Sequence, residues 1–166
     1  MEAAVLSLLS RTKLHIPARL WVELTTTLHS KTEGVHESGA FLLGRINGCS
    51  RHVVEIVYYD AIDSNAYKSG VVVIHASSFG ALWAHCRETE FQVVADVHVH
   101  VGSARQSRAD KEHPMIAQKR HLALILPDFA APPVEAERIG LYEYRGCHQW
   151  RNLGHGRIAR HLIIGI

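Results

Sequence analysis

The pattern of apolar and polar residues predicts two amphipathic helices. Leucines recur at helical spacing in the first of them: Leu20, Leu24 and Leu28. Pro17 suits the first helical turn because its missing N–H costs nothing there. We therefore expect a helix over about 17–30 that ends before Gly34. The second helix would be capped by Ser77 or Ser78, and four residues form its apolar face: Phe79, Leu82, Trp83 and Cys86.

Short apolar and β-branched runs predict strands between and after these helices. Ala40–Ile46 and Arg51–Tyr59 flank Asn47-Gly48, a strong hairpin signal. Four further strands are expected: Val71–Ile74, Gln92–His100, Leu122–Leu126 and Arg138–Tyr144. A short helix fits between Gln106 and His121. Because helices and strands alternate while a hairpin is present, the pattern predicts an α+β (mixed α/β) fold with helices packed on a mixed sheet.

Length and charge narrow the class of protein. The 166 residues suffice for one domain with one core, so we expect a single domain over 1–166. The formal charge of +2 argues against a dedicated nucleic-acid binder, which would carry a strong basic excess.

Cysteine usage and the N-terminus favour a soluble cytoplasmic protein. The chain has three cysteines, Cys49, Cys86 and Cys147. Their number is odd and no two are spaced as CxxC, which disfavours both a disulfide framework and a thiolate zinc site. Residues 1–10 carry Glu2 where a signal peptide has positive charge, and their apolar run is short. No run approaches the roughly 20 apolar residues that cross a bilayer. We therefore expect no membrane partner.

The stretch from Asp96 to His113, DVHVHVGSARQSRADKEH, carries the most informative polar residues. His98 and His100 stand two apart near the end of a predicted strand, so both imidazoles project to the same side. Asp110 follows a loop that can fold back, and its carboxylate can supply a third ligand. Two histidines and one carboxylate leave a fourth position for water, which is the arrangement of a catalytic zinc.

Hydrolysis at such a centre needs three kinds of help. Zinc lowers the pKa of a bound water to about 7, a nearby carboxylate takes the proton and passes it to the leaving amine, and a donor meets the developing oxyanion. Ser107 is placed near the metal by the same loop as Asp110 and is the candidate donor. His98-Val99-His100 alone is weak support among 13 histidines. Ser107-x-x-Asp110 and a separate upstream Glu strengthen it.

These residues resemble the JAMM motif of the JAB/MPN metalloprotease family. That motif is an upstream Glu, then His-x-His, about seven residues, and Ser-x-x-Asp. The matching residues here are Glu37, His98, His100, Ser107 and Asp110, with six residues in the spacer. The segment Glu37-Ser38-Gly39-Ala40-Phe41-Leu42-Leu43-Gly44 is also similar to the family's E-x-G-x-x-L-x-G pattern. The resemblance covers roughly residues 15–145, and small bacterial members are the most similar.

The resemblance implies a fold and a reaction. The implied fold is a curved mixed sheet flanked by helices, as in cytidine deaminases. Zinc would be held by His98, His100 and Asp110, with Glu37 as general base and then acid and Ser107 as oxyanion donor. The implied activity is peptide or isopeptide cleavage after the C-terminal glycine of a ubiquitin-like protein. Activating and conjugating enzymes of such a pathway are the expected partners.

The chain departs from the family pattern at three places. The spacer after His100 is one residue short, Val99 stands where Ser or Thr is usual, and Val101 stands where proline is usual. Gly102 can absorb the turn of the shorter loop. Val99 is expected to point away from the metal face, so its apolar side chain suits packing.

Two other function classes stay open. DNA-associated proteins of the RadC type also resemble the HxH pattern, although the weak charge and the lack of a helix-hairpin-helix extension count against that class. Some MPN domains are non-catalytic interaction modules, but those usually lack motif residues that this chain retains.

Single residues also have structural explanations. Asp96 either orients a ligand imidazole or pairs with backbone or a buried donor. Asp110 and Ser107 suit a helix N-terminus. His113 is expected on a helix surface, and His36 is expected to point away from Glu37. The tryptophans are expected in the core: Trp21, Trp83 and Trp150.

Overall fold

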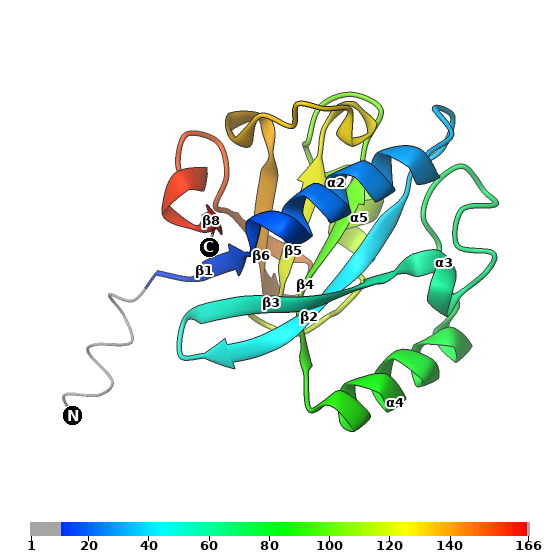
Figure 1. Cartoon of the computed structure of the whole chain (residues 1–166), viewed down its shortest axis with the longest axis horizontal. Coiled ribbons are helices and arrows are strands. Elements are labelled where there is room, and N and C mark those ends of the chain that lie inside the picture. Colours follow the sequence, from blue (N-terminus) through cyan, green and yellow to red (C-terminus); the bar gives the residue numbers. More distant parts are fainter. Residues whose placement is uncertain (1–10, 166) are drawn as a thin grey trace.

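A computed structural model describes residues 11–165 (Figure 1). The strands are β1 (Lys13–Ile16), β2 (Gly39–Asn47), β3 (Ser50–Tyr58), β4 (Gln92–Val99), β5 (Leu122–Leu126), β6 (Gly140–Gly146), β7 (Gln149–Asn152) and β8 (Leu162–Ile164). The α-helices are α2 (Ala18–Lys31), α3 (Tyr59–Ile62), α4 (Phe79–Thr89) and α5 (Arg108–Glu112), and short 3-10 turns lie at η1 (Ala76–Ser78), η2 (Asp128–Ala130), η3 (Ala136–Arg138) and η4 (Ile158–Arg160). The predicted α+β class is confirmed.

The strands form one mixed sheet in the order β7-β6-β5-β4-β2-β3-β1-β8. β1 runs parallel to β3 and β8, and β4 runs parallel to β5, while the other neighbours are antiparallel. The sheet curls around α2, and α4 and α5 lie on the other side (Figure 1). The predicted hairpin at Asn47-Gly48 is confirmed, because Asn47 pairs with Ser50.

Helix α2 fills the concave side of the sheet. Its three leucines are buried as predicted and pack in one cluster with residues from both halves of the sheet, among them Leu14, Leu141 and Leu162. Pro17 stands at the N-cap, one position earlier than predicted. The helix ends at Lys31, where the Thr32 hydroxyl donates to the His29 carbonyl at 2.7 Å.

A bulge in β4 decides which residues face α4 and α5. Leu42 pairs with Ala95 and Leu43 pairs with Val93, so Val94 has no partner in β2. Val93 and Asp96, an odd number of residues apart, therefore lie on one face of the strand, where regular alternation would separate them. Arg51, which is buried, donates from its guanidinium to the Val94 carbonyl at 3.1 Å and also to the Arg120 carbonyl.

We expect Arg51→Ala to destabilise the fold by about 2–4 kcal/mol, because it leaves two carbonyls near the bulge without a charged donor. Urea unfolding measures this change as a lower midpoint. Arg87→Ala, which removes an exposed arginine of α4, should stay within about 0.5 kcal/mol of the parent. Equal midpoints for Arg51→Ala and the parent would contradict the role given to Arg51.

Several predicted features are wrong. Val71–Ile74 forms no strand. Its amides bond locally instead, Val72 to the Glu37 carboxylate at 3.4 Å and Val73 to the Ala66 carbonyl at 3.0 Å. Trp83 is 39% exposed and Cys86 is half-buried, whereas both were expected inside.

Short strands at the two ends of the described chain escape the sequence pattern. β1, β7 and β8 are three or four residues long, which is too short for a period of two to stand out. The apolar C-terminal run places Leu162–Ile164 at the sheet edge beside β1. The expectation for residues 1–10 lies outside the described residues. Across 11–165, no helix has both the length and the apolar character to span a membrane.

Candidate metal centre

Two histidines meet where β4 ends. His98 is buried near the end of the strand, and His100 follows it in a half-buried position. The His100 amide donates to the Leu126 carbonyl at 3.0 Å, which keeps the chain beside β5. The Nε2 atoms of the two rings lie 3.0 Å apart. The structure thus brings the two imidazoles together, as the spacing predicts.

Asp110 reaches the same point from the first turn of α5. Its Oδ1 lies 3.3 Å from Nε2 of His98, and its Oδ2 lies 3.4 Å from Nε2 of His100. Oδ2 also accepts from the Ser107 amide at 2.6 Å, while the Ser107 hydroxyl accepts from the Asp110 amide at 3.1 Å. This reciprocal capping box fixes the carboxylate locally. The six-residue spacer therefore still brings Asp110 to both histidines.

The spacing of the three ligand atoms suits zinc. A tetrahedral ion with bonds of about 2.0–2.1 Å separates neighbouring ligands by roughly 3.3–3.4 Å. The two Nε2 atoms lie 3.0 Å apart, and each has one Asp110 oxygen at a similar distance, Oδ1 at 3.3 Å from His98 and Oδ2 at 3.4 Å from His100. Within residues 11–165, these three side chains form a cluster that could hold a metal ion. The residues present therefore fit a zinc ion.

The outer nitrogens of the two rings are in different environments. Nδ1 of His100 lies 3.3 Å from the Ser103 carbonyl, which can only accept, so the proton belongs on Nδ1 and the Nε2 lone pair is free. Nδ1 of His98 is buried and has no hydrogen-bond partner among the described residues. His98 is thus oriented by its packing in β4 rather than by an outer acceptor.

Glu37 lies beside this cluster, immediately before β2. Its Oε1 is 3.8 Å from Nε2 of His100, and its Oε2 accepts from the Val72 amide at 3.4 Å. The pairing of Gly39 with His98 brings the two segments into register. A Cβ at Gly39 would meet the Tyr59 ring at 2.2 Å, so only glycine fits two residues after Glu37.

Glycine is also required at Gly44, the last glycine of the motif segment, for a similar steric reason. A Cβ there would meet the His52 carbonyl oxygen at 1.8 Å, at the bulge between β2 and β3. The two motif glycines therefore have packing reasons of their own, independent of Glu37.

Charged neighbours shift the pKa values of His100 and Asp110. Burial lowers the pKa of His100, but its hydrogen bond to Asp110 and the charges of Asp110 and Glu37 outweigh this and leave it raised. Burial raises the pKa of Asp110, but hydrogen bonds from His100 and His98 leave it far below its usual range. Asp110 is therefore an anion at neutral pH.

Zinc binding should weaken as the pH falls through the raised pKa of His100, by up to about tenfold per pH unit below it. Zinc and the proton compete for the same imidazole, so the ion must displace a proton from it in that range. In the metal-free protein, the stability of the fold depends on pH in the opposite direction. Protonation of His100 stabilises the fold, and this contribution is fully present below pH 6.5, the ordinary pKa of histidine in the unfolded chain. It is lost as the pH rises through the raised pKa of His100 in the folded protein. Competition with a fluorescent zinc chelator measures the first effect, and a pH-independent affinity would contradict it.

Three other residues named in the sequence analysis, Asp96, Ser107 and His113, support the fold or line the site. Asp96 pairs with buried donors, His121 at 2.6 Å and Tyr59 at 3.5 Å, which confirms the second of its two predicted roles. Ser107 caps α5 through an acceptor lone pair, so its hydroxyl hydrogen stays available as a donor. His113 ends α5 and lines the pocket at the site.

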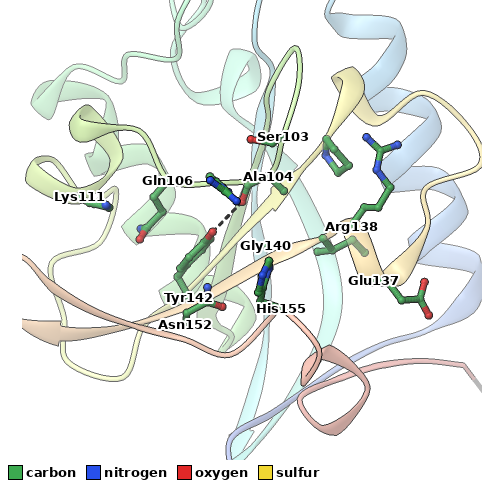
Figure 2. A pocket seen from close by; sticks show the side chains of 13 residues that line it. Ser103, Ala104, Gln106, Lys111, Glu137, Arg138, Gly140, Tyr142, Asn152 and His155 are labelled. Atoms are coloured by element: carbon green, nitrogen blue, oxygen red, sulfur yellow. Dashed lines mark hydrogen bonds between the residues drawn. The ribbon is translucent and has the colours of Figure 1, made fainter.

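The pocket at the site is small and shares one lining residue with a larger groove. Glu37, His98 and Asp110 line a space of about 40 Å³. Gln106 lines this pocket and also a neighbouring groove of about 600 Å³ (Figure 2). In Figure 2, Gln106 and Lys111 lie at one end of that groove and Arg138 at the other, with Gly140 between them. The groove is thus the larger open space beside the candidate metal centre.

Comparison with known proteins supports the fold. No family model matches the chain. Protein DSY2949 from Desulfitobacterium hafniense, a solution structure, is similar with a TM-score of 0.68 at 15% identity, covering 91% of this chain and 92% of that one. A solution structure of a protein from Salinibacter ruber is similar with a TM-score of 0.56 at 17% identity, covering 83% and 87%. Both likenesses concern the architecture of the chain.

Proposed function

We propose that this protein is a zinc-dependent peptidase or isopeptidase of the JAMM type that cleaves after the C-terminal glycine of a ubiquitin-like protein. One observation carries the proposal: the Nε2 atoms of His98 and His100 lie 3.0 Å apart, the two oxygens of Asp110 lie 3.3 and 3.4 Å from them, and the Glu37 carboxylate lies beside this cluster. Two imidazoles and one carboxylate are the donor set of a catalytic zinc site.

The chain's own residues would divide the chemistry among them. Zinc, when bound, would supply a Lewis acid that lowers the pKa of a coordinated water and polarises a carbonyl. Glu37 would take the proton of the attacking water and deliver it to the leaving amine. Its bond from the Val72 amide holds one oxygen and leaves the other facing the histidines. Ser107 would donate to the oxyanion with its free hydroxyl hydrogen.

The walls of the pocket favour glycine next to the scissile bond. A space of about 40 Å³ at Glu37 and His98 has no room for a large side chain. Exposed valines are neighbours in sequence of the site residues: Val71 and Val73 flank Val72, which lines the pocket, and Val101 follows His100. A glycine-ended, partly apolar tail therefore suits this site.

Zinc analysis joined to a cleavage assay tests the proposal. The substrate is a ubiquitin-like protein whose Gly-Gly terminus is fused to a reporter peptide. We expect about one zinc per chain, cleavage after the terminal glycine, loss of cleavage with a chelator, and recovery on adding zinc. A purified protein that binds no zinc would overturn the proposal and would favour a non-catalytic interaction module. Zinc binding with DNA association and no cleavage would favour the RadC-type alternative.

A further inference from the structure

Four arginines gather around a second hollow. It encloses about 250 Å³ and is lined by Arg11, Arg151, Leu153, Arg157, Arg160 and His161. Arg11 precedes β1, Arg151 and Leu153 lie at the end of β7 and just after it, and the other three lie immediately before, in and after η4. Gly156 at φ +79° and the bond from the Arg157 amide to the Gly154 carbonyl make the turn that returns the chain beside β7. The fold therefore assembles a positive hollow from distant segments.

This hollow lies on the other face of the sheet from the candidate metal centre. Trp150 and Arg151 are neighbours along β7, so their side chains project to opposite faces. Trp150 donates to the Lys111 carbonyl of α5, on the face that carries Asp110. Arg151 consequently projects toward the face that α2 covers. A ligand in this hollow would not touch His98, His100 or Asp110.

The arginine charges lack acidic partners. Within residues 11–165, no ion pair joins Arg151, Arg157 or Arg160 to a carboxylate. Arg151 does act on the charge of Glu143. Glu143 is buried, however, and its two oxygens accept from Arg145 and from the Thr12 hydroxyl, each at 2.8 Å. The like charges at the hollow are therefore left for an external anion to neutralise.

His161 adds a buried polar group to the same hollow. Its side chain belongs to a residue that is only 5% exposed, and its Nδ1 donates to the Thr12 carbonyl at 2.7 Å. A carbonyl can only accept, so Nδ1 carries the proton and Nε2 is the ring atom left for a ligand. Nε2 has no protein partner in the described part of the chain. The four arginines are exposed, and the buried imidazole with one open nitrogen gives the hollow a fixed polar group beneath them.

We propose that this hollow binds a small anion carrying two or more phosphate groups. Guanidinium forks bind phosphate oxygens in pairs, which suits arginine better than lysine for this ligand. Four such charges are enough to neutralise a pyrophosphate anion, and the volume of about 250 Å³ suits a small ligand. Buried Leu153 forms an apolar floor that keeps water from one side.

Calorimetric titration with pyrophosphate tests the site. We expect saturable one-to-one binding to the full chain, and a loss of roughly tenfold or more in the Arg157→Gln/Arg160→Gln double variant. The Arg19→Gln/Arg87→Gln variant makes the same change of charge on α2 and α4 and should bind like the parent. Circular dichroism confirms that each variant is folded. Equal affinity in both double variants would overturn the proposal.

Two further experiments distinguish binding in this hollow from binding at the metal centre and from binding of RNA or membranes. Because pyrophosphate also binds metal ions, the titration is repeated in Asp110→Asn, where the affinity should be unchanged. Loss of binding in that variant would place pyrophosphate at the metal centre and overturn the proposal. A single-stranded RNA and a vesicle of anionic phospholipid are the remaining probes. Tight binding of either, without saturable binding of pyrophosphate, would reject a small-anion site. None of these outcomes depends on peptidase activity.

Discussion

Glu37→Gln should abolish cleavage while leaving zinc bound. The amide keeps the size of the side chain and an oxygen that can accept from the Val72 amide, so the pocket should keep its shape. What the variant loses is the ability to take and return a proton, a contribution of about 10²–10⁴-fold to the rate. We expect kcat to fall by that factor and the zinc content to remain one per chain. Single-turnover cleavage of the reporter fusion with parallel metal analysis measures both.

Glu88→Gln is the matched control for this experiment. Glu88 is an exposed residue of α4 and takes no part in the site. Its variant should cleave like the parent. If Glu37→Gln retained the parent rate, the carboxylate would not be the proton carrier. If it lost zinc as well as activity, Glu37 would instead be a metal ligand.

Asp110→Asn should remove most of the stabilisation that zinc gives to the fold. A ligand at one hundred times its Kd stabilises a protein by about 2.7 kcal/mol, and a hundredfold weaker affinity reduces this to about 0.4 kcal/mol. Asparagine can still accept from the Ser107 amide, so α5 should keep its cap while the ionised ligand is lost. Thermal unfolding with and without zinc reports the difference as a lost shift in Tm.

Asp128→Asn controls for the loss of a carboxylate alone. Asp128 pairs with Arg138 at 2.6 Å on an exposed part of the surface. Its variant should show the full zinc-dependent shift. A full shift in Asp110→Asn would mean that the carboxylate is only a capping group and that zinc, if it binds, has another third ligand.

The sequence predicts the candidate site better than it predicts the sheet. His98 and His100 come together because strand alternation is a local rule that sequence spacing expresses directly. Asp110 joins them through a capping box between residues three apart, which is also local. The separation of Glu37 from this cluster along the chain is bridged by the pairing of β2 with β4. Here the motif resemblance supplied what periodicity alone does not.

Features that depend on distant packing were missed. The strand prediction at 71–74 failed because side chains and loop carbonyls bond its amides, where a strand would use a neighbouring strand. β8 is recognisable only once β1 lies beside it. The bulge at Val94 depends on Arg51, more than 40 residues away and joined to it by a bond across the sheet. Local sequence periodicity does not predict a buried arginine that donates to backbone carbonyls of distant segments.

The capping box of α5 bears on how this protein would lose and regain an ion. The Asp110 carboxylate closes the first helical turn and faces the two imidazoles. Short-range hydrogen bonds therefore hold its oxygens in position whether or not an ion is bound. Stripping the ion should then leave the backbone standing, and reloading should proceed at the pace of diffusion instead of refolding. A cell could therefore switch such a protein on and off through zinc supply without degrading and resynthesising it.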